Sequence, residues 1–405
     1  MTEIIPFQGI TYNPAGIPLS KVIAPPADTI TPEKLTMLLE QHPQNITRMI
    51  YPQADSSAVE SVRIFQDWSS EGVLLTEKNP VIYVVEQIFR TSEGKQQRRR
   101  GFIALWKFDD QTAAINQSLT RRLDWIGDTG IWPTPLFVLY DDSTRRIDRY
   151  ISYAVRSVPV VDVTVDDVRT TMWKLNEGGA IAGIIREIRE KQVGVTGDGT
   201  DISTAYALRS VHPHHAGPEP YNFVSTLFVN AGEPGLVSVP MHRICTFHRE
   251  FSTEDIKSRL GQIFTLTELE DRNELIIRMA EFGSHAVGIG FSGEHRYSLA
   301  VLKEPVDYEN QDGAIPIRYA LKLFDEVIRT ITRDGSDILK VRYTSDTVKV
   351  WNALESGEAQ VVCFANPTPV ETIVAALSSR LPIPEGIIDF YPHLPLGLVL
   401  HTFHE

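Results

Sequence analysis

Runs rich in Val, Ile, Phe and Tyr, separated by turn-forming residues, dominate the first half of the chain and predict a series of strands. The expected strands are residues 80–90, 101–108, 133–142, 151–157 and 158–165. Prolines in the two opening segments remove backbone donors. Residues 4–14 and 21–30 are therefore expected to form strand ends and loops.

Helices are expected where the apolar positions follow a period of 3.6 residues. Thr31 at an N-cap position and Pro32 at the first helical position predict a helix over residues 31–42. A second helix is expected over residues 57–71. The period of 3.6 also predicts one broken helix or two short helices within residues 165–192.

The remainder of the chain mixes both patterns and shows no internal repeat. Further helices are expected over residues 221–230, 251–264, 316–332 and 369–380, and strands or extended segments over residues 193–196, 235–247, 285–291, 295–303, 338–346, 358–366 and 390–403. This mixture predicts the α+β class, with mixed β-sheets and helices packed on them.

The chain length predicts more than one folded unit, because 405 residues exceed the size at which one hydrophobic core usually suffices. We expect an N-terminal α/β unit over residues 1–164, a central unit over residues 165–304, and a C-terminal α/β unit over residues 305–405 that closes onto the first. The sequence contains no long low-complexity tract, so we expect nearly every segment to be ordered.

The acidic balance argues against nucleic acid and membranes as partners. Lys and Arg number 39 against 52 Asp and Glu, so the net charge is −13, which repels phosphate groups unless basic residues cluster on one face. One basic run, residues 95–100, lies between two expected strands, and we interpret it as a solvated hairpin end rather than a phosphate-binding patch. The expected partner is a small-molecule ligand or another protein.

Cysteine usage and the apolar runs indicate a cytoplasmic protein. Cys245 and Cys363 lie in apolar segments outside any metal or redox motif, and we expect both to be buried, reduced thiols. The first residues lack the basic and apolar regions of a signal peptide, and no run approaches the roughly 18 apolar residues that span a bilayer.

Residues 193–210 have the pattern of a strand, a glycine-rich turn that includes Gly199, and a helix. Thr200, Asp201 or Ser203 could cap that helix. A helix start presents amide hydrogens and a positive dipole end, which is the physical basis of many phosphate sites. Asp198 and Asp201 oppose an anion unless a metal ion lies between them and it. The pattern therefore predicts either an ordinary turn or a phosphate site that uses Mg²⁺.

Several segments, taken in order, resemble a broad bacterial and archaeal family known as domain of unknown function number one thousand and fifteen. The matching segments are IPFQGITYNP, KVIAPPADTI, VIYVVEQIF, RRGFIAL, PTPLFVLYDD, VPMHRI and FYPHLPLGL. Each segment is modest alone, but together they cover almost the whole chain in the right order.

Many polar signature residues of that family are replaced here. Asn116 and Gln117 stand where the family has a His-Glu pair, and Ile202 stands at the arginine of its Asp-Gly-His-His-Arg motif, of which Asp198 and Gly199 remain. The family's C-terminal Pro-x-Lys-Ser-Thr-x-Phe-x-Pro-Lys becomes PEGIIDFYPH, so both lysines are lost.

The family's Asp-Gly-His-His-Arg element in turn resembles the Gly-x-His-Arg motif of the ParB and sulfiredoxin superfamily, which includes free-serine kinases. Proteins of that superfamily hold a nucleotide phosphate at a helix start, with the arginine paired to it. The double resemblance implies a ParB/sulfiredoxin-like core and a nucleotide-binding phosphotransferase or hydrolase. Ile202 cannot make the arginine's contact with phosphate.

Other polar residues are candidates for chemistry. His242 and Arg243 match the family's Pro-x-His-Arg and are candidate ligands of an anionic group; alternatively, Arg243 pairs with a carboxylate across a domain boundary. Asp28, which follows two prolines, is a candidate general base or metal ligand; alternatively, it is a capping carboxylate. The histidines of residues 212–215 lie in a Pro-Gly-rich loop, and we interpret them as solvated rather than metal-bound.

Two functions fit these features. The first is a divergent kinase of the serine-kinase-like group, with Asp28 as general base and a nucleotide with Mg²⁺ as cofactor. In this hypothesis the residues that bind the cofactor are Asp198, Gly199, Thr200, His242 and Arg243, and those that bind the metal are Asp198 and Asp201. The second is a catalytically inactive relative that acts as a binding or regulatory protein.

Overall fold

A computed structural model of the protein describes residues 1–52, 57–108, 120–197, 199–211, 220–247, 252–303, 320–331, 339–381, 383 and 386–403. Several mixed sheets with helices packed on them form the structure, so the predicted α+β class is confirmed. The chain divides into two compact units. Unit 1 comprises Met1–Val195, Gly199–Val237 and Pro392–Glu405, and unit 2 comprises Thr196–Asp198 and Ser238–Tyr391. The three units expected from the chain length stay a prediction.

The main sheet of unit 1 has the strand order β10-β7-β11-β5-β4-β9-β8, with β1 beside β5. Its strands are β1 (Glu3–Ile5), β4 (Ile82–Arg90), β5 (Gln96–Lys107), β7 (Leu136–Tyr140), β8 (Val161–Val165), β9 (Val168–Leu175), β10 (Val193–Val195) and β11 (Phe223–Asn230). β7 and β11 run parallel, and the other paired strands run antiparallel.

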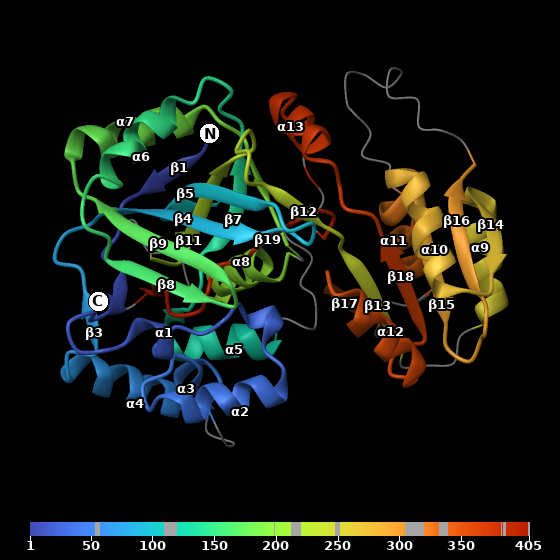
Figure 1. Cartoon of the computed structure of the whole chain (residues 1–405), viewed down its shortest axis with the longest axis horizontal. Coiled ribbons are helices and arrows are strands. Elements are labelled where there is room, and N and C mark those ends of the chain that lie inside the picture. The colour runs from blue at the N-terminus through green and yellow to red at the C-terminus, as the bar shows by residue number, and fades with distance from the viewer. Residues whose placement is uncertain are drawn as a thin grey trace. The chain divides into compact units, whose positions relative to one another are not determined.

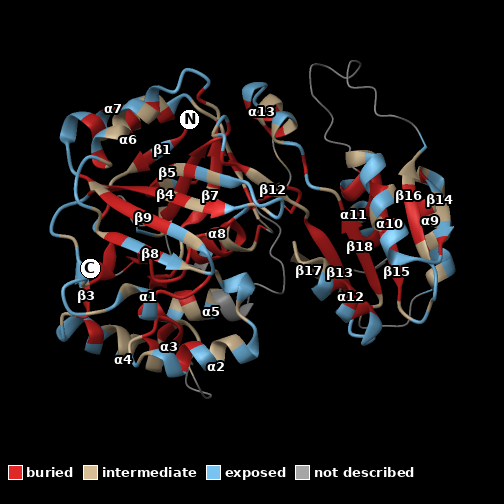
Figure 2. Ribbon diagram, in the orientation of Figure 1, coloured by how far each residue is buried: buried red, intermediate tan, exposed pale blue. Residues whose placement is uncertain are grey.

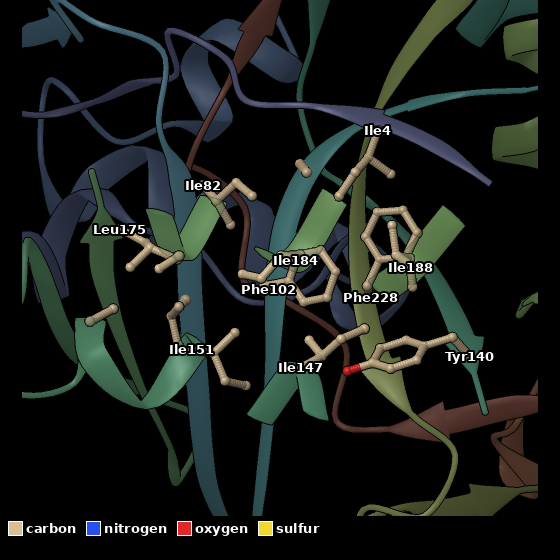
Figure 3. Packing of buried hydrophobic residues seen from close by; sticks show 14 of the residues in the cluster. Ile4, Ile82, Phe102, Tyr140, Ile147, Ile151, Leu175, Ile184, Ile188 and Phe228 are labelled. Atoms are coloured by element: carbon tan, nitrogen blue, oxygen red, sulfur yellow. The ribbon is translucent and has the colours of Figure 1, made fainter. Parts of the chain in front are cut away.

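Two helices, α6 (Arg146–Ala154) and α7 (Gly178–Arg189), cover one face of this sheet (Figure 1). Phe102 of β5 stacks on Phe228 of β11 with ring centroids 5.0 Å apart, and Ile147 of α6 belongs to the same core (Figure 3). Successive side chains of a strand point to opposite faces, so the odd-numbered residues of β4 and β5 face away from these helices.

Segments from both ends of the chain cover the opposite face of the sheet. The other helices of unit 1 are α1 (Leu19–Val22), η1 (Ala27–Thr29), α2 (Pro32–Gln41), α3 (Thr47–Ile50), α4 (Ser57–Ser70), α5 (Thr120–Thr129), α8 (Thr200–Val211) and η3 (Pro220–Asn222). Two small sheets pair β2 (Ile10–Tyr12) with β3 (Leu74–Thr76), and β6 (Ile131–Trp132) with β20 (His401–Thr402). The chain ends are bound together, because Ile10 N–H donates to the Leu400 carbonyl at 3.0 Å and Leu396 N–H donates to the Ala24 carbonyl at 2.9 Å.

Unit 2 contains a six-stranded antiparallel sheet of order β14-β16-β15-β18-β13-β17. Its strands are β13 (His242–Phe247), β14 (Phe264–Leu269), β15 (Ala286–Phe291), β16 (Tyr297–Leu302), β17 (Leu339–Thr344) and β18 (Val361–Ala365); β12 (Val237–Val239) and β19 (Asp389–Tyr391) pair separately. The helices are α9 (Thr253–Ile263), α10 (Arg272–Glu281), η4 (Gly283–His285), α11 (Ala320–Ile331), α12 (Thr347–Glu355) and α13 (Val370–Ser378). A core between the sheet and helices α10 and α12 includes Leu275, Trp351 and Phe364.

Most expected elements are confirmed, including the helix cap at Thr31, whose hydroxyl oxygen accepts from Lys34 N–H at 3.2 Å. Three expectations were wrong. Residues 168–175 and 223–230 form strands β9 and β11 rather than helices, and residues 151–154 belong to helix α6 rather than a strand. Every residue of β11 is buried, so its apolar run lacks the alternation that identifies a strand (Figure 2).

Candidate functional site

The glycine-rich turn has the predicted form of strand, turn and helix. β10 ends at Val195 and α8 begins at Thr200, and between them Gly197 and Gly199 have φ angles of 84° and 78°, a region that favours glycine. The first helical hydrogen bond runs from Ser203 N–H to the Gly199 carbonyl at 2.9 Å. Asp198, which the sequence predicts to bind the cofactor and a metal ion, lies outside the described residues. The shared metal site of Asp198 and Asp201 therefore stays a prediction.

Ile202, which the sequence resemblance places at the family's arginine, is part of a hydrophobic core. Its side chain is 2% exposed and packs in a cluster with Leu208 of the same helix, Trp132 of β6 and Phe403. The helix start therefore offers backbone groups near Thr200 but no basic side chain at position 202.

His242 is buried in unit 2 and has two hydrogen-bonding partners. Its Nδ1 accepts from Ala365 N–H at 3.0 Å, which assigns the ring proton to Nε2, and Nε2 lies 3.1 Å from the Thr347 hydroxyl. Burial and the neighbouring Arg243 lower the pKa of His242 to about 4. The ring is therefore neutral near pH 7 and holds β13 to its neighbours.

Arg243 forms a buried ion pair. Its side chain is 0% exposed, and its Nε and Nη2 atoms donate to the two carboxylate oxygens of Asp325 in α11 at 3.1 and 2.9 Å. A third hydrogen bond reaches the Met241 carbonyl at 2.5 Å, and the guanidinium lies 4.7 Å from the centre of the Tyr343 ring. The alternative expectation, that Arg243 pairs with a carboxylate across a domain boundary, is right for the carboxylate and wrong for the boundary, because Arg243 and Asp325 both belong to unit 2. This pair would have to break before Arg243 could bind a phosphate group.

Asp28 of η1 contacts His393, a residue that the sequence did not single out. His393 Nδ1 lies 3.1 Å from Asp28 Oδ1, and the two side chains are 33% and 50% exposed. His393 ends PEGIIDFYPH, the segment in which the sequence resemblance predicts the family's second lysine at this position. Asp28 of the segment KVIAPPADTI therefore contacts His393 of the segment FYPHLPLGL.

Buried side chains of β4 and β5 hold the backbone at His393. Gln87 Nε2 donates to the His393 carbonyl at 3.1 Å, and Arg99 Nη2 donates to Gln87 Oε1 at 2.6 Å and to the Pro392 carbonyl. Arg99 is 2% exposed and lies over the Phe137 ring, so the interpretation of residues 95–100 as a solvated hairpin end is wrong for this residue. Strand alternation could have placed Arg99 inside, since it shares a face with Ile103.

The predicted site residues are distributed over both units. Asp28, Gly199, Thr200 and Asp201 belong to unit 1, and His242 and Arg243 belong to unit 2. The direct contacts join Asp28 to His393 and Arg243 to Asp325. Asn116, Gln117 and the histidines of residues 212–215 lie outside the described residues.

Compared with known families, the chain matches the one described as Protein of unknown function (DUF1015) over residues 4–328. The chain belongs to this family. The family resemblance expected from the sequence is thereby confirmed, and the replacement of signature residues in this DUF1015 member stays a prediction.

Solved structures similar to this DUF1015 member share little sequence with it. A conserved hypothetical protein from Pyrococcus furiosus is 12% identical with a TM-score of 0.35, over 70% of this chain and 87% of that chain. Free serine kinase in complex with AMP is 12% identical with a TM-score of 0.32, over 69% and 81% of the two chains. A variant of free serine kinase in complex with ADP is 9% identical with a TM-score of 0.31, over 69% and 82%. No curated protein matches the chain.

The described residues contain neither a membrane-spanning helix nor a cluster of metal ligands. Among them, no helix has the length and apolar character needed to cross a membrane. Within the same ranges, no group of three or more His, Cys, Asp or Glu side chains could hold a metal ion.

Proposed function

We propose that this DUF1015 member is a divergent small-molecule kinase that transfers phosphate to a hydroxyl group of a serine-like substrate. The observation that carries the proposal is the Asp28–His393 contact, which is partly exposed and anchored to the central strands by Gln87 and Arg99. A carboxylate–imidazole pair in such a position suits removal of a proton from a hydroxyl group. The proposed location is the cytoplasm, and the proposed partner is a small molecule.

The proposed nucleotide phosphate lies at the start of α8, near Gly199 and Thr200. Phosphoryl transfer depends on positioning and on neutralisation of charge, so the loss of an arginine at Ile202 has to be compensated. Mg²⁺ held by Asp198 and Asp201 is the proposed compensation. His242 and Arg243 have no part in this version, because their described contacts are with protein groups.

A second candidate function is that of an inactive relative that binds or regulates another protein. Two observations favour it: Ile202 is buried in the core where the family has its arginine, and Arg243 is fully engaged with Asp325 and Met241. Both residues would then serve the stability of a scaffold that has lost phosphate chemistry.

Calorimetric titration with ADP and ATP, with and without Mg²⁺, separates the two candidates, together with a phosphate-transfer assay on serine and related hydroxylated amino acids. The kinase proposal expects Mg²⁺-dependent nucleotide binding and transfer to one of these acceptors. Asp28→Asn should lower kcat by about 10²- to 10⁴-fold and leave nucleotide affinity within about threefold. Asp67→Asn, an exposed change on α4, is the matched control. Absence of nucleotide binding would refute the kinase and favour the inactive relative.

A further inference from the structure

We propose that His393, and not Asp28, is the group that accepts the proton of the substrate hydroxyl, and that Asp28 is the residue that positions its ring. This inference rests on the proposed kinase function and assigns the proton transfer to a particular nitrogen, Nε2 of His393. It also assigns a role to a histidine in the C-terminal segment that the sequence did not single out.

The geometry of the imidazole carries the first step. His393 Nδ1 lies 3.1 Å from Asp28 Oδ1, within hydrogen-bonding distance. A carboxylate can only accept, so in the neutral ring Nδ1 carries the proton and donates it to Asp28. The lone pair then resides on Nε2, on the other side of the ring. A carboxylate that holds a histidine in this tautomer is the recurring arrangement for a histidine base.

Both partners are held in place by the backbone around them. The carbonyls of Pro392 and His393 accept from Arg99 and Gln87, which extend from β5 and β4 and are both buried. On the other side, the Pro26 carbonyl accepts from Thr29 N–H at 3.0 Å and from the Thr29 hydroxyl at 2.8 Å, which closes the turn that carries Asp28. An ordinary surface ion pair between long side chains lacks this support and contributes little.

The basicity of the two groups decides which one takes the proton. An ordinary carboxyl group has a pKa of about 3.9 and an ordinary imidazole about 6.5. A general base is most effective when its pKa lies near the working pH. At neutral pH an imidazole is therefore the better acceptor, and a carboxylate beside it is better suited to stabilise the imidazolium that forms.

The reaction step balances as follows. His393 Nε2 takes the proton from the substrate hydroxyl as the oxygen forms a bond to the terminal phosphorus of a nucleoside triphosphate. The bond from that phosphorus to the bridging oxygen breaks, and the nucleoside diphosphate leaves with the electron pair. The imidazolium is stabilised by the Asp28 carboxylate and returns its proton to water after the product has left.

The first test measures the tautomer and needs no enzymatic activity. Long-range ¹H–¹⁵N correlation spectra of the protein labelled on its 11 histidines, with His393→Gln to assign the signal, report which ring nitrogen carries the proton. We expect Nδ1–H in the wild-type protein and loss of this preference in Asp28→Ala, with Asp67→Ala unchanged. A wild-type ring protonated at Nε2, or a tautomer unaffected by Asp28→Ala, would overturn the inference. If the tautomer is as expected and no phosphate transfer occurs, the proposed kinase fails while the Asp28–His393 arrangement stands.

The second test distinguishes a base from a structural partner. His393→Lys keeps a donor toward Asp28 but has no lone pair at neutral pH, and His393→Gln removes the base with a neutral side chain. If His393 is the base, kcat in both variants falls by about 10²-fold or more with nucleotide affinity unchanged. A His393→Lys variant that keeps its kcat within about threefold would assign the base to Asp28 instead. Thermal unfolding of both variants verifies that they remain folded.

Discussion

Two buried histidines, His242 in β13 and His401 in β20, are poor bases in the folded protein. Burial lowers the pKa of each to about 4, with Arg243 adding to the effect at His242. His401 Nε2 also has no hydrogen-bonding partner in the described structure, and the ring packs against Phe7 and Phe403. In the unfolded chain both rings regain a pKa of about 6.5. Between these values the unfolded state binds more protons than the folded state.

We therefore expect the free energy of unfolding to be highest above pH 6.5 and to fall as the pH drops toward 4. The loss amounts to about 3 kcal/mol for each histidine at the acidic end. Urea titrations from pH 4 to pH 7 measure it. His401→Phe should remove about half of this pH dependence, whereas His295→Gln, an exposed change, should leave it intact. An unchanged pH dependence in His401→Phe would contradict the assignment.

The Arg243–Asp325 pair makes a second prediction for single residues. Removal of one partner of a buried pair leaves an uncompensated charge, so Asp325→Ala should lower the free energy of unfolding by about 3–5 kcal/mol. Glu358→Ala, which breaks the exposed Arg342–Glu358 pair of the same unit, should cost less than about 1 kcal/mol. An equal decrease in the free energy of unfolding in the two variants would show that burial does not make the Arg243–Asp325 pair more important for stability than an exposed pair.

Individual elements show where sequence patterns were informative. Exposed helices such as α2 have caps and one apolar face, and these local signals were sufficient to predict the helices from the sequence. The strands β9 and β11 lie inside the sheet with most side chains buried on both faces, so nothing in their sequences separates them from buried helices. Only the tertiary structure, which supplies the neighbouring strands, determines their class.

The hairpin between β8 and β9 turns through Asp166 and Asp167, whose φ angles are 47° and 62°. Two consecutive residues in this region form the tight turn that prefers glycine at its second position. Asp167→Gly should therefore raise the free energy of unfolding by about 1 kcal/mol. Gln66→Gly, in an exposed position of α4, should lower it by a similar amount. Thermal unfolding of both variants checks the sign, and a destabilised Asp167→Gly would contradict the turn.

At the scale of the whole molecule, the sequence located half of the candidate site. Asp28 and the glycine turn carry local signals, namely two prolines and the glycines before a helix. The partner of Asp28 could not be found this way, because His393 lies near the other end of the chain. Likewise, Asp325 reaches Arg243 from a helix distant in sequence. Contacts of this kind follow from topology and leave no mark in either segment.

Unit 1 depends on residues 392–403, since Leu396, Leu398 and Leu400 are buried in it and β20 pairs with β6. A chain terminated after Tyr391 should therefore lose amide protection in β4 and β5, whereas β15 and β18 of unit 2 should keep theirs. Hydrogen exchange followed by mass spectrometry measures both. Retained protection of β4 and β5 would show that unit 1 folds without its final segment.

The chain thus leaves unit 1 at Val237, completes unit 2, and returns at Pro392. During synthesis on the ribosome, every strand of unit 2 is made before the last segment of unit 1 exists. Until residues 392–403 have been synthesised, part of the apolar surface of unit 1 remains exposed to water. Unit 1 is therefore the unit that chaperones would protect. The Asp28–His393 pair can form only after residue 393 has been synthesised, so a chain that terminates before this residue lacks the pair.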